Sequence, residues 1–320
     1  MKISYHVSHE QFSASELLDL VRHAESAGFD AAFSSDHFQP WVPAQGHSAH
    51  LWAWLGSALQ ATTRMSFAAI TIPGGWRHHP AMIAQAVATL SQMYPGRLPW
   101  LALGSGEALN ESVVGEWPDK AERAVRLREG ADIVRQLLRG ATVTSDGMIP
   151  LRQARLWPRP PVEPVALVGA ALSEATAAAV AEWADGLLTT AGTKEALERI
   201  VTAFRRVAPG KPMHAKVDLS WAPSDEQAMA QAREQWAFSN LPKDDLAELS
   251  TPEQFERAVS RLAKDIDPTV LVSSDFERHI DWLRQHQALG FETLNLHNVG
   301  RNQHEFIDAF GTHVLPRLRS

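Results

Sequence analysis

The 320-residue chain contains no cysteine, so it can form no disulfides, thiolate metal sites or cysteine nucleophiles. It also lacks an excess of positive charge, because 30 Lys and Arg stand against 37 Asp and Glu. That balance leaves no basic field for nucleic acid or an acidic membrane. No apolar run reaches the roughly 18 residues of a membrane span, and the N-terminus lacks the apolar core of a signal peptide. We therefore expect a cytoplasmic protein that binds neither nucleic acid nor membrane.

Tyrosine is also scarce, with two residues against eleven tryptophans. The tryptophans either fill the core or form apolar walls around a flat ligand, and the composition leaves both interpretations open. An apolar fraction of 45% is enough for a sizeable core. The length exceeds that of an average domain but is typical of an α/β barrel that forms a single domain.

Short apolar runs alternate with amphipathic helical stretches along the whole chain. Eight runs have the composition of buried strands, at residues 2–7, 30–34, 65–72, 98–103, 164–168, 184–188, 212–221 and 292–297. The intervening pattern predicts helices at residues 13–28, 51–62, 80–93, 119–139, 194–207, 274–289 and 302–318, a helix after Ala171, and a mostly helical stretch at 225–264. A small hairpin is expected near residues 143–147, and an extended connection at 157–161.

Eight strands alternating with helices predict an α/β fold, a closed (β/α)8 TIM barrel that spans residues 1–320 as a single domain. Loop insertions are expected after the fourth and seventh strands. A doubly wound open sheet is the competing fold. That fold usually places a glycine-rich phosphate loop after its first strand, where this chain has His6-Val7-Ser8-His9.

Polar residues follow the strands, at the end of a barrel where ligands bind. Asp36 and His37 follow the second strand and, as neighbours, point opposite ways, so one would face a ligand while the other braces the loop. A neutral histidine can take a hydroxyl proton, and a nearby carboxylate can tune its pKa. The competing interpretation is that Asp36 caps a turn and His37 is an ordinary satisfied polar residue.

The fourth strand ends in Gly104-Ser105-Gly106-Glu107, where glycines would let the backbone approach a planar ligand. Beside an aromatic ring, the pKa of Glu107 would rise and the residue could act as an acid. The alternative is a tight turn with a solvated glutamate. Gly169-Ala170-Ala171 before a helix suits a phosphate or plain close packing. The histidine spacings fit no standard metal signature, so we expect no metal.

These motifs, taken in order, resemble the luciferase-like (LLM class) superfamily of flavin- and F420-dependent oxidoreductases. Within it they resemble the F420-dependent glucose-6-phosphate dehydrogenase group. The resemblance covers nearly the whole chain and is carried by Ser35-Asp36-His37-Phe38-Gln39-Pro40-Trp41, Arg77-His78-His79-Pro80-Ala81-Met82-Ile83-Ala84-Gln85-Ala86 and Gly104-Ser105-Gly106-Glu107-Ala108-Leu109-Asn110-Glu111.

The resemblance implies a bacterial luciferase-like barrel that holds a tricyclic cofactor at the carboxyl ends of its strands. It implies catalytic roles for His37 as a base, Glu107 as an acid and Trp41 as the indole that shapes the substrate side. The implied cofactor-binding residues are Asp36, Ile70, Thr71, Ser105, Gly106, Glu107, Asn110, Gly169, Ala170, Ala171 and Thr190. It also implies a non-proline cis peptide at Ile70–Thr71.

The chain departs from the sugar-phosphate enzymes at two basic positions, where it has Thr193 and Thr269. Without such cations a doubly charged phosphate is poorly held, so glucose 6-phosphate is not the expected substrate. A narrower resemblance, over residues 5–12 and 296–303, is to a branch of the group thought to have reverted from F420 to a flavin.

We therefore expect an FMN-dependent oxidoreductase or monooxygenase-type enzyme that transfers hydride to or from a small organic substrate, and that is a homodimer. One alternative is a coenzyme F420-dependent dehydrogenase of an alcohol or sugar. Another is a flavin-binding protein without catalytic activity.

Overall fold

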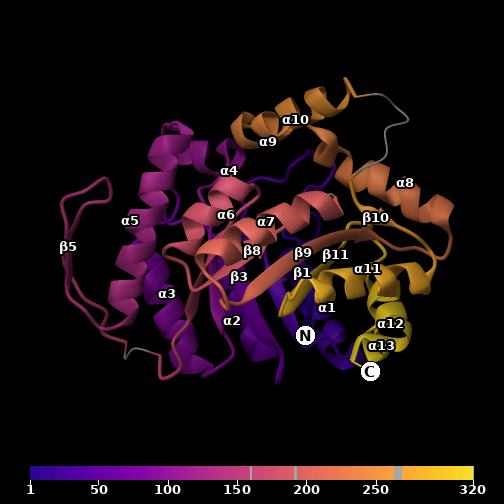
Figure 1. The fold of residues 1–320 in the computed structure, drawn as a ribbon, viewed down its shortest axis with the longest axis horizontal. Helices are drawn as coiled ribbons and strands as arrows, with labels where there is room; N and C mark the ends of the chain where they lie inside the picture. Colours follow the sequence, from indigo (N-terminus) through magenta and orange to yellow (C-terminus); the bar gives the residue numbers. More distant parts are fainter. Residues whose placement is uncertain (159–160, 191–192, 263–268, 320) are drawn as a thin grey trace.

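The computed structural model describes residues 1–158, 161–190, 193–262 and 269–319. Its centre is a closed barrel of parallel strands (Figure 1). The strands are β1 (Lys2–Val7), β2 (Ala31–Ser34), β3 (Ser66–Thr71), β4 (Trp100–Leu103), β7 (Ala166–Ala170), β8 (Gly186–Thr189), β9 (Met213–Ser220) and β11 (Thr293–Asn298). They pair in the order β9-β11-β1-β2-β3-β4-β7-β8, and β8 pairs with β9 to close the ring. The predicted (β/α)8 barrel is confirmed.

Helices cover the outside of the barrel. They are α1 (Ala14–Ala27), α2 (Leu51–Ala61), α3 (Pro80–Met93), α5 (Lys120–Leu138), α6 (Glu174–Ala181), α7 (Lys194–Val207), α11 (Phe276–Ala288), α12 (Gln303–His313) and α13 (Leu315–Arg319). The first helix begins after Ser13, whose side chain forms a capping box with Glu16, and ends at Gly28 in the left-handed conformation (φ 99°).

Two insertions interrupt the alternation, as expected. After β4 come α4 (Ala108–Glu111), η1 (Ser112–Val114), α5 and an antiparallel hairpin of β5 (Val143–Ser145) and β6 (Leu151–Ala154). After β9 come α8 (Asp225–Trp236), η2 (Ala237–Asn240), α9 (Lys243–Glu248), α10 (Pro252–Val259) and the short strand β10 (Leu271–Val272). In Figure 1, α4, α9 and α10 lie at the end of the barrel opposite the N-terminus. Residues 159–160 of the predicted extended connection and residues 263–264 of the predicted helical stretch lie outside the described residues.

Two sequence-based expectations are wrong. The residues that the structure describes contain no cis peptide bond, so the bond between Ile70 and Thr71 is trans, the form that is favoured for a non-proline residue by about 3–4 kcal/mol. Both residues lie in the ladder of β3, opposite Ala102 and Leu103 of β4. The predicted final helix is also divided, with α12 ending at His313 and α13 beginning at Leu315. Pro316 explains the break, since proline has no N–H to donate to a continuing helix.

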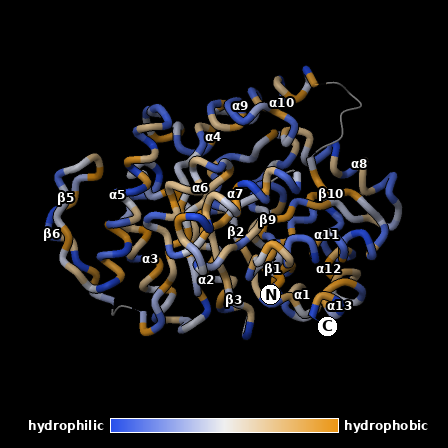
Figure 2. Tube along the Cα trace, in the orientation of Figure 1, coloured by the Kyte–Doolittle hydropathy of each residue, from blue (hydrophilic) through white to orange (hydrophobic). Residues whose placement is uncertain are grey.

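The interior of the barrel has an apolar half and a polar half. Because side chains alternate along a strand, residues that face the helices leave their neighbours facing the axis. The apolar half comes from β2, β3, β4, β7 and β8 and contains Phe33, Ala68, Ile70, Trp100, Ala102, Val168 and Leu188. The polar half comes from β1, β9 and β11 and contains Ser4, His6, His214, Lys216, Asp218, Asn295 and His297. Figure 2 shows hydrophobic residues gathered in the middle of the molecule, with hydrophilic ones along α8 and α9.

Helix α5 packs so closely against the loop after β3 that position 130 has room only for glycine. A Cβ added there would lie 2.9 Å from Pro73 Cβ and would collide with the Pro73 carbonyl oxygen. We predict that Gly130→Ala destabilises the protein by about 1–3 kcal/mol through overpacking, despite the better helix propensity of alanine. Urea unfolding measures the change. Gly115→Ala is the control, because nothing lies within 4 Å of its added Cβ; equal midpoints for the two variants would contradict the prediction.

Candidate active site

His37 lies at the carboxyl end of the barrel, in the loop after β2, with two carboxylates at one edge of its ring. Its Nε2 is 3.1 Å from Glu10 Oε1 and 3.8 Å from Glu107 Oε1. Two backbone N–H groups, of Phe38 and Gln39, donate to Asn110 Oδ1, which fixes the orientation of that amide. The Asn110 Nδ2 then faces Glu107 Oε1 at 2.6 Å and His37 Nδ1 at 3.1 Å. Asn110 therefore joins the predicted base and the predicted acid.

Glu10 is a site residue that the sequence analysis did not single out. Its side chain is 3% exposed and accepts hydrogen bonds from the hydroxyls of Ser8 and Ser35, each at 3.0 Å. Burial alone would raise its pKa, but the nearby His37, a backbone N–H and Ser8 together lower it. Its position directly after His9, at a strand tip, was the available signal.

Asp36 points away from His37, as adjacent residues in extended backbone do. Its carboxylate accepts from Thr71 Oγ1 at 2.6 Å, pairs with Arg77 Nη1 at 2.7 Å, and lies 3.0 Å from His78 Nε2. Burial would raise the pKa of Asp36, but the hydrogen bond from His78 and the charge of Arg77 outweigh it and hold the pKa well below its usual range. This carboxylate is 2% exposed and firmly held by the protein.

Arg77 also contacts a second buried acid, Glu111, with Nη2 3.2 Å from Oε1. Burial raises the pKa of Glu111 to about 7, against the attraction of Arg77. The Oε2 of Glu111 has no hydrogen-bond partner among the described residues. Arg77 is thus shared by Asp36 and Glu111. All three residues belong to the sequence motifs quoted above, but the sequence did not show that they are in contact.

The turn between β4 and α4 depends on glycine. Gly106 has φ 80°, and a Cβ there would lie 3.0 Å from Glu111 Cγ and 3.2 Å from Trp117 Cη2. Glu107 stands at the N-cap position of α4. This short helix, which the sequence did not predict, places Glu107 and Asn110 one turn apart, so that both face His37.

Trp41 forms an aromatic wall beside His37. Its ring stacks on Phe238 with centroids 4.9 Å apart and planes at 15°, and meets Phe255 edge-on at 5.3 Å. The Trp41 and His37 rings are 5.1 Å apart. Phe238 and Phe255 come from η2 and α10, about 200 residues further along the chain, so the second insertion completes this wall.

Gly104, Ile70 and Ala170 form an apolar surface at the same end of the barrel, which we call the shelf. A Cβ on Gly104 would lie 3.7 Å from Ile70 Cδ1 and 3.8 Å from Ala170 Cβ, so these three residues are neighbours. Ile70 and Ala170 are half-buried although they belong to barrel strands, which leaves part of their surface uncovered. The other half-buried residues predicted to bind the cofactor are Ser105, Gly106, Glu107 and Thr190.

Three other predicted cofactor residues lie below the surface. The hydroxyl of Thr71 donates its hydrogen bond to Asp36, and Ala171 belongs to the hydrophobic core. Gly169 packs against α6, where an added Cβ would lie 2.6 Å from Val180 Cβ. Gly169 is therefore required for packing between β7 and α6, in agreement with the alternative of close packing given above. Cofactor binding by these three residues stays a prediction.

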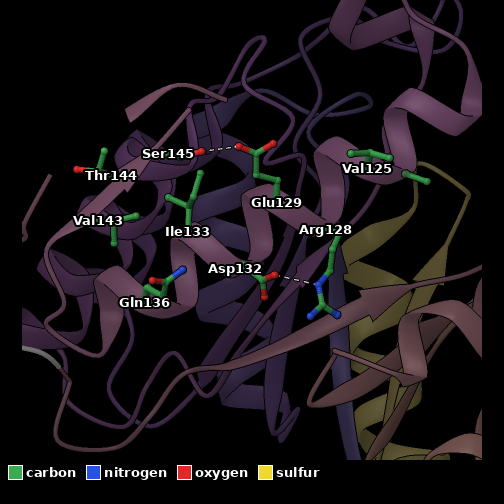
Figure 3. Close-up of a pocket in the computed structure, with 10 residues that line it drawn as sticks. Val125, Arg128, Glu129, Asp132, Ile133, Gln136, Val143, Thr144 and Ser145 are labelled. Atoms are coloured by element: carbon green, nitrogen blue, oxygen red, sulfur yellow. Dashed lines mark hydrogen bonds and ion pairs between the residues drawn. The ribbon is translucent and has the colours of Figure 1, made fainter. Parts of the chain in front are cut away.

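A surface hollow of about 610 Å³ lies elsewhere, between α5 and the hairpin (Figure 3). Figure 3 shows Glu129 bonded to Ser145 and Arg128 bonded to Asp132 along its walls. None of the predicted site residues lines it. Across the described ranges, no helix combines the length and hydrophobicity that a membrane crossing requires.

Comparison with known proteins places these features in a family. Residues 1–293 match the family of luciferase-like monooxygenases. The chain is 34% identical over 331 residues to the F420-dependent glucose-6-phosphate dehydrogenase of Microbacterium testaceum, covering all of this chain and 98% of that protein.

Two solved structures are informative. One is an F420-dependent secondary alcohol dehydrogenase in complex with an F420-acetone adduct, 29% identical with a TM-score of 0.89, covering all of this chain and 99% of that one. The other is the oxygenating constituent of 3,6-diketocamphane monooxygenase from Pseudomonas putida in complex with FMN. It is 15% identical with a TM-score of 0.70 over 99% of each chain, and at that identity it supports the fold alone. The chain therefore belongs to the luciferase-like monooxygenase family and is an oxidoreductase.

Proposed function

We propose that this oxidoreductase is an F420-dependent dehydrogenase that interconverts a small uncharged alcohol and its carbonyl compound. The observation that carries the proposal is the placement of His37 Nε2, 3.1 Å from Glu10 and 3.8 Å from Glu107, beside the Trp41 wall. Oxidation of an alcohol must remove a proton from oxygen and a hydride from carbon. A histidine held in this way is suited to the proton.

In this mechanism a substrate hydroxyl would lie at the edge of the His37 ring. His37 takes the hydroxyl proton as the carbon–oxygen double bond forms, and the hydride leaves the same carbon. Nε2 can take this proton in the tautomer whose ring hydrogen is on Nδ1, where it donates to the carbonyl oxygen of Gln39 at 3.3 Å rather than accepting from Asn110. The proton received at Nε2 then lies next to the carboxylate of Glu10, which stabilises the imidazolium. Glu107, joined to His37 through Asn110, would hold or deliver a second proton.

A tricyclic cofactor would supply the hydride acceptor. The shelf of Gly104, Ile70 and Ala170 would hold its ring, with Ser105, Gly106 and Thr190 at the margins. The relative with 34% identity supports coenzyme F420 over FMN. FMN, which the narrower sequence resemblance favours, stays the competing prediction.

An uncharged substrate is supported by the residues at the two positions where sugar-phosphate enzymes use cations. Thr193 caps α7, its hydroxyl accepting from the N–H of Ala196. Thr269 is bonded to Ser239 through both its N–H and its hydroxyl. Neither threonine can supply the charge that a phosphate needs, whereas Trp41, Phe238 and Phe255 suit an apolar group.

The cofactor is tested by titrating the purified protein with F420 and with FMN, following absorbance and fluorescence. We predict tighter binding of F420, and strong weakening of it in Ala170→Phe, because the new ring would cover the shelf. Leu172→Phe, at a 55% exposed position two residues away, is the matched control. Tighter binding of FMN would reject the F420 proposal, and unchanged binding by Ala170→Phe would reject the shelf.

With the better-bound cofactor, oxidation of 2-propanol and of glucose 6-phosphate separates the two substrate classes. Faster oxidation of the sugar phosphate would contradict the proposal that the substrate is uncharged.

The expected homodimer and the organisation of residues 1–320 as one domain stay predictions.

A further inference from the structure

We propose that the amino-terminal end of the barrel holds a second binding site, for a small neutral aromatic compound with a hydroxyl or N–H group on one edge. A hollow of about 540 Å³ opens there, at the opposite end of the strands from His37. Its lining includes Ser4, His214 and Asn295, from the polar half of the barrel, and Ala31, Ala68 and Trp100, from the apolar half. It shares no residue with the proposed active site.

Three buried polar atoms in this lining have no hydrogen-bond partner among the described residues: Ser4 Oγ, His214 Nδ1 and Asn295 Oδ1. The three residues are 1%, 4% and 0% exposed. Buried polar groups are nearly always paired in folded proteins. Three unpaired ones on neighbouring strands β1, β9 and β11, around one hollow, indicate a partner that is not part of the chain.

The polar edge requires a donor from that partner. The Nδ2 of Asn295 donates to the carbonyl of Ala215 at 3.3 Å, so the orientation of the amide is fixed and Oδ1 is an acceptor. Burial, reinforced by the charge of Lys2, lowers the pKa of His214 to about 4. His214 is therefore neutral near pH 7, and its Nδ1 can donate or accept according to the tautomer, as can the hydroxyl of Ser4.

The lining next to this polar edge is apolar. Trp100 stacks directly on His214, with ring centroids 4.3 Å apart and planes at 13°, so the indole lies beside the polar edge. Ala31 and Ala68 present only methyl groups beside it. A ligand with one polar edge and one apolar side matches both parts of this lining, and a single substituted aromatic ring is small enough for the space. Lys2 and Glu292 also line the hollow, but the buried edge of Ser4, His214 and Asn295 carries no charge, so a charged group placed there would be desolvated without a counter-charge from these three residues.

Phenol is the probe, and toluene is the matched compound of the same shape without a donor. Both are titrated into the full-length protein by calorimetry and by tryptophan ¹⁵N–¹H NMR, and phenol is soaked into crystals. We expect phenol beside Asn295, with affinity at least about tenfold above that of toluene, a ratio equivalent to about 1.4 kcal/mol. Equal affinities, no binding of phenol, or crystals that show only ordered water in the hollow would overturn the proposal.

Variants test whether phenol binds beside Ser4 and Asn295. Ser4→Ala and Asn295→Leu are expected to weaken the binding of phenol by about tenfold and to leave the binding of toluene unchanged. Ser91→Ala, which removes another buried and unpaired hydroxyl elsewhere in the protein, is the control and should bind phenol normally. If Asn295→Leu does not fold, Ser4→Ala decides. Phenol binding that survives Ser4→Ala unchanged would reject the site, whatever the outcome of the cofactor titrations.

Discussion

Replacing His37 by alanine is expected to lower kcat for alcohol oxidation by about 10²–10⁴-fold, the usual contribution of a positioned general base. The reason is geometric, since the ring edge of His37 faces the two carboxylates at 3.1 and 3.8 Å. Cofactor binding should change little, because the shelf is formed by other residues. Steady-state kinetics with the better-bound cofactor, together with its titration, separates the two effects.

Two further variants sharpen this test. Glu107→Gln should lower kcat with little change in cofactor affinity. Glu10→Gln should retain more activity than His37→Ala but shift the pH profile of kcat, because it removes the carboxylate that stabilises a proton on His37. A wild-type rate in His37→Ala would reject the assignment, as would an unchanged pH profile in Glu10→Gln.

Replacing Arg77 by alanine is expected to destabilise the protein by about 3–5 kcal/mol, because it removes the cation between two buried carboxylates. Asp36 would lose a partner at 2.7 Å and Glu111 one at 3.2 Å. The protein would have to bury uncompensated charge or protonate these acids on folding. Urea unfolding at pH 5.5 and at pH 8 measures the loss.

The pH dependence follows from the sign of each pKa shift. Glu111 has a folded pKa of about 7, above its unfolded value, so stability from its protonated form falls as the pH rises between about 4.5 and 7. Asp36 has a lowered folded pKa, so its stabilisation holds at neutral pH and is lost in acid. Without Arg77 both pKa values rise, and the deficit of Arg77→Ala should be larger at pH 8 than at pH 5.5.

Arg128→Ala is the control for this charge network. Arg128 is 50% exposed and pairs with Asp132 along α5, and such pairs contribute about 0.3–0.5 kcal/mol. A deficit in Arg77→Ala that matches the control, or that is the same at both pH values, would show that the network does not hold the site.

The sequence was sufficient for features that depend on local pattern. Apolar runs located all eight barrel strands to within a few residues, and α7 was predicted with its observed bounds. His37 and Glu107 were identified because they follow buried strands, and parallel strands bring their carboxyl ends together.

Contacts between distant segments were not predictable. Asp36 and Arg77 are 41 positions apart, and nothing in the composition of either motif says that one arginine serves two acids. Phe238 and Phe255 reach Trp41 from an insertion whose path the helical pattern could not define. The cis peptide expected at Ile70–Thr71 came from resemblance, and the bond is trans.

The pairing of β1 with β2 on one side and β11 on the other has a consequence for how the chain folds. During synthesis β2 follows β1 closely, but β11, the other neighbour of β1, is made almost 300 residues after it. Tyr5 must likewise wait for Gln303, which accepts a hydrogen bond from its hydroxyl at 2.9 Å. Contacts this distant in sequence form slowly and leave strand edges open meanwhile. The edge of β1 that pairs with β11 therefore stays open until β11 has been made.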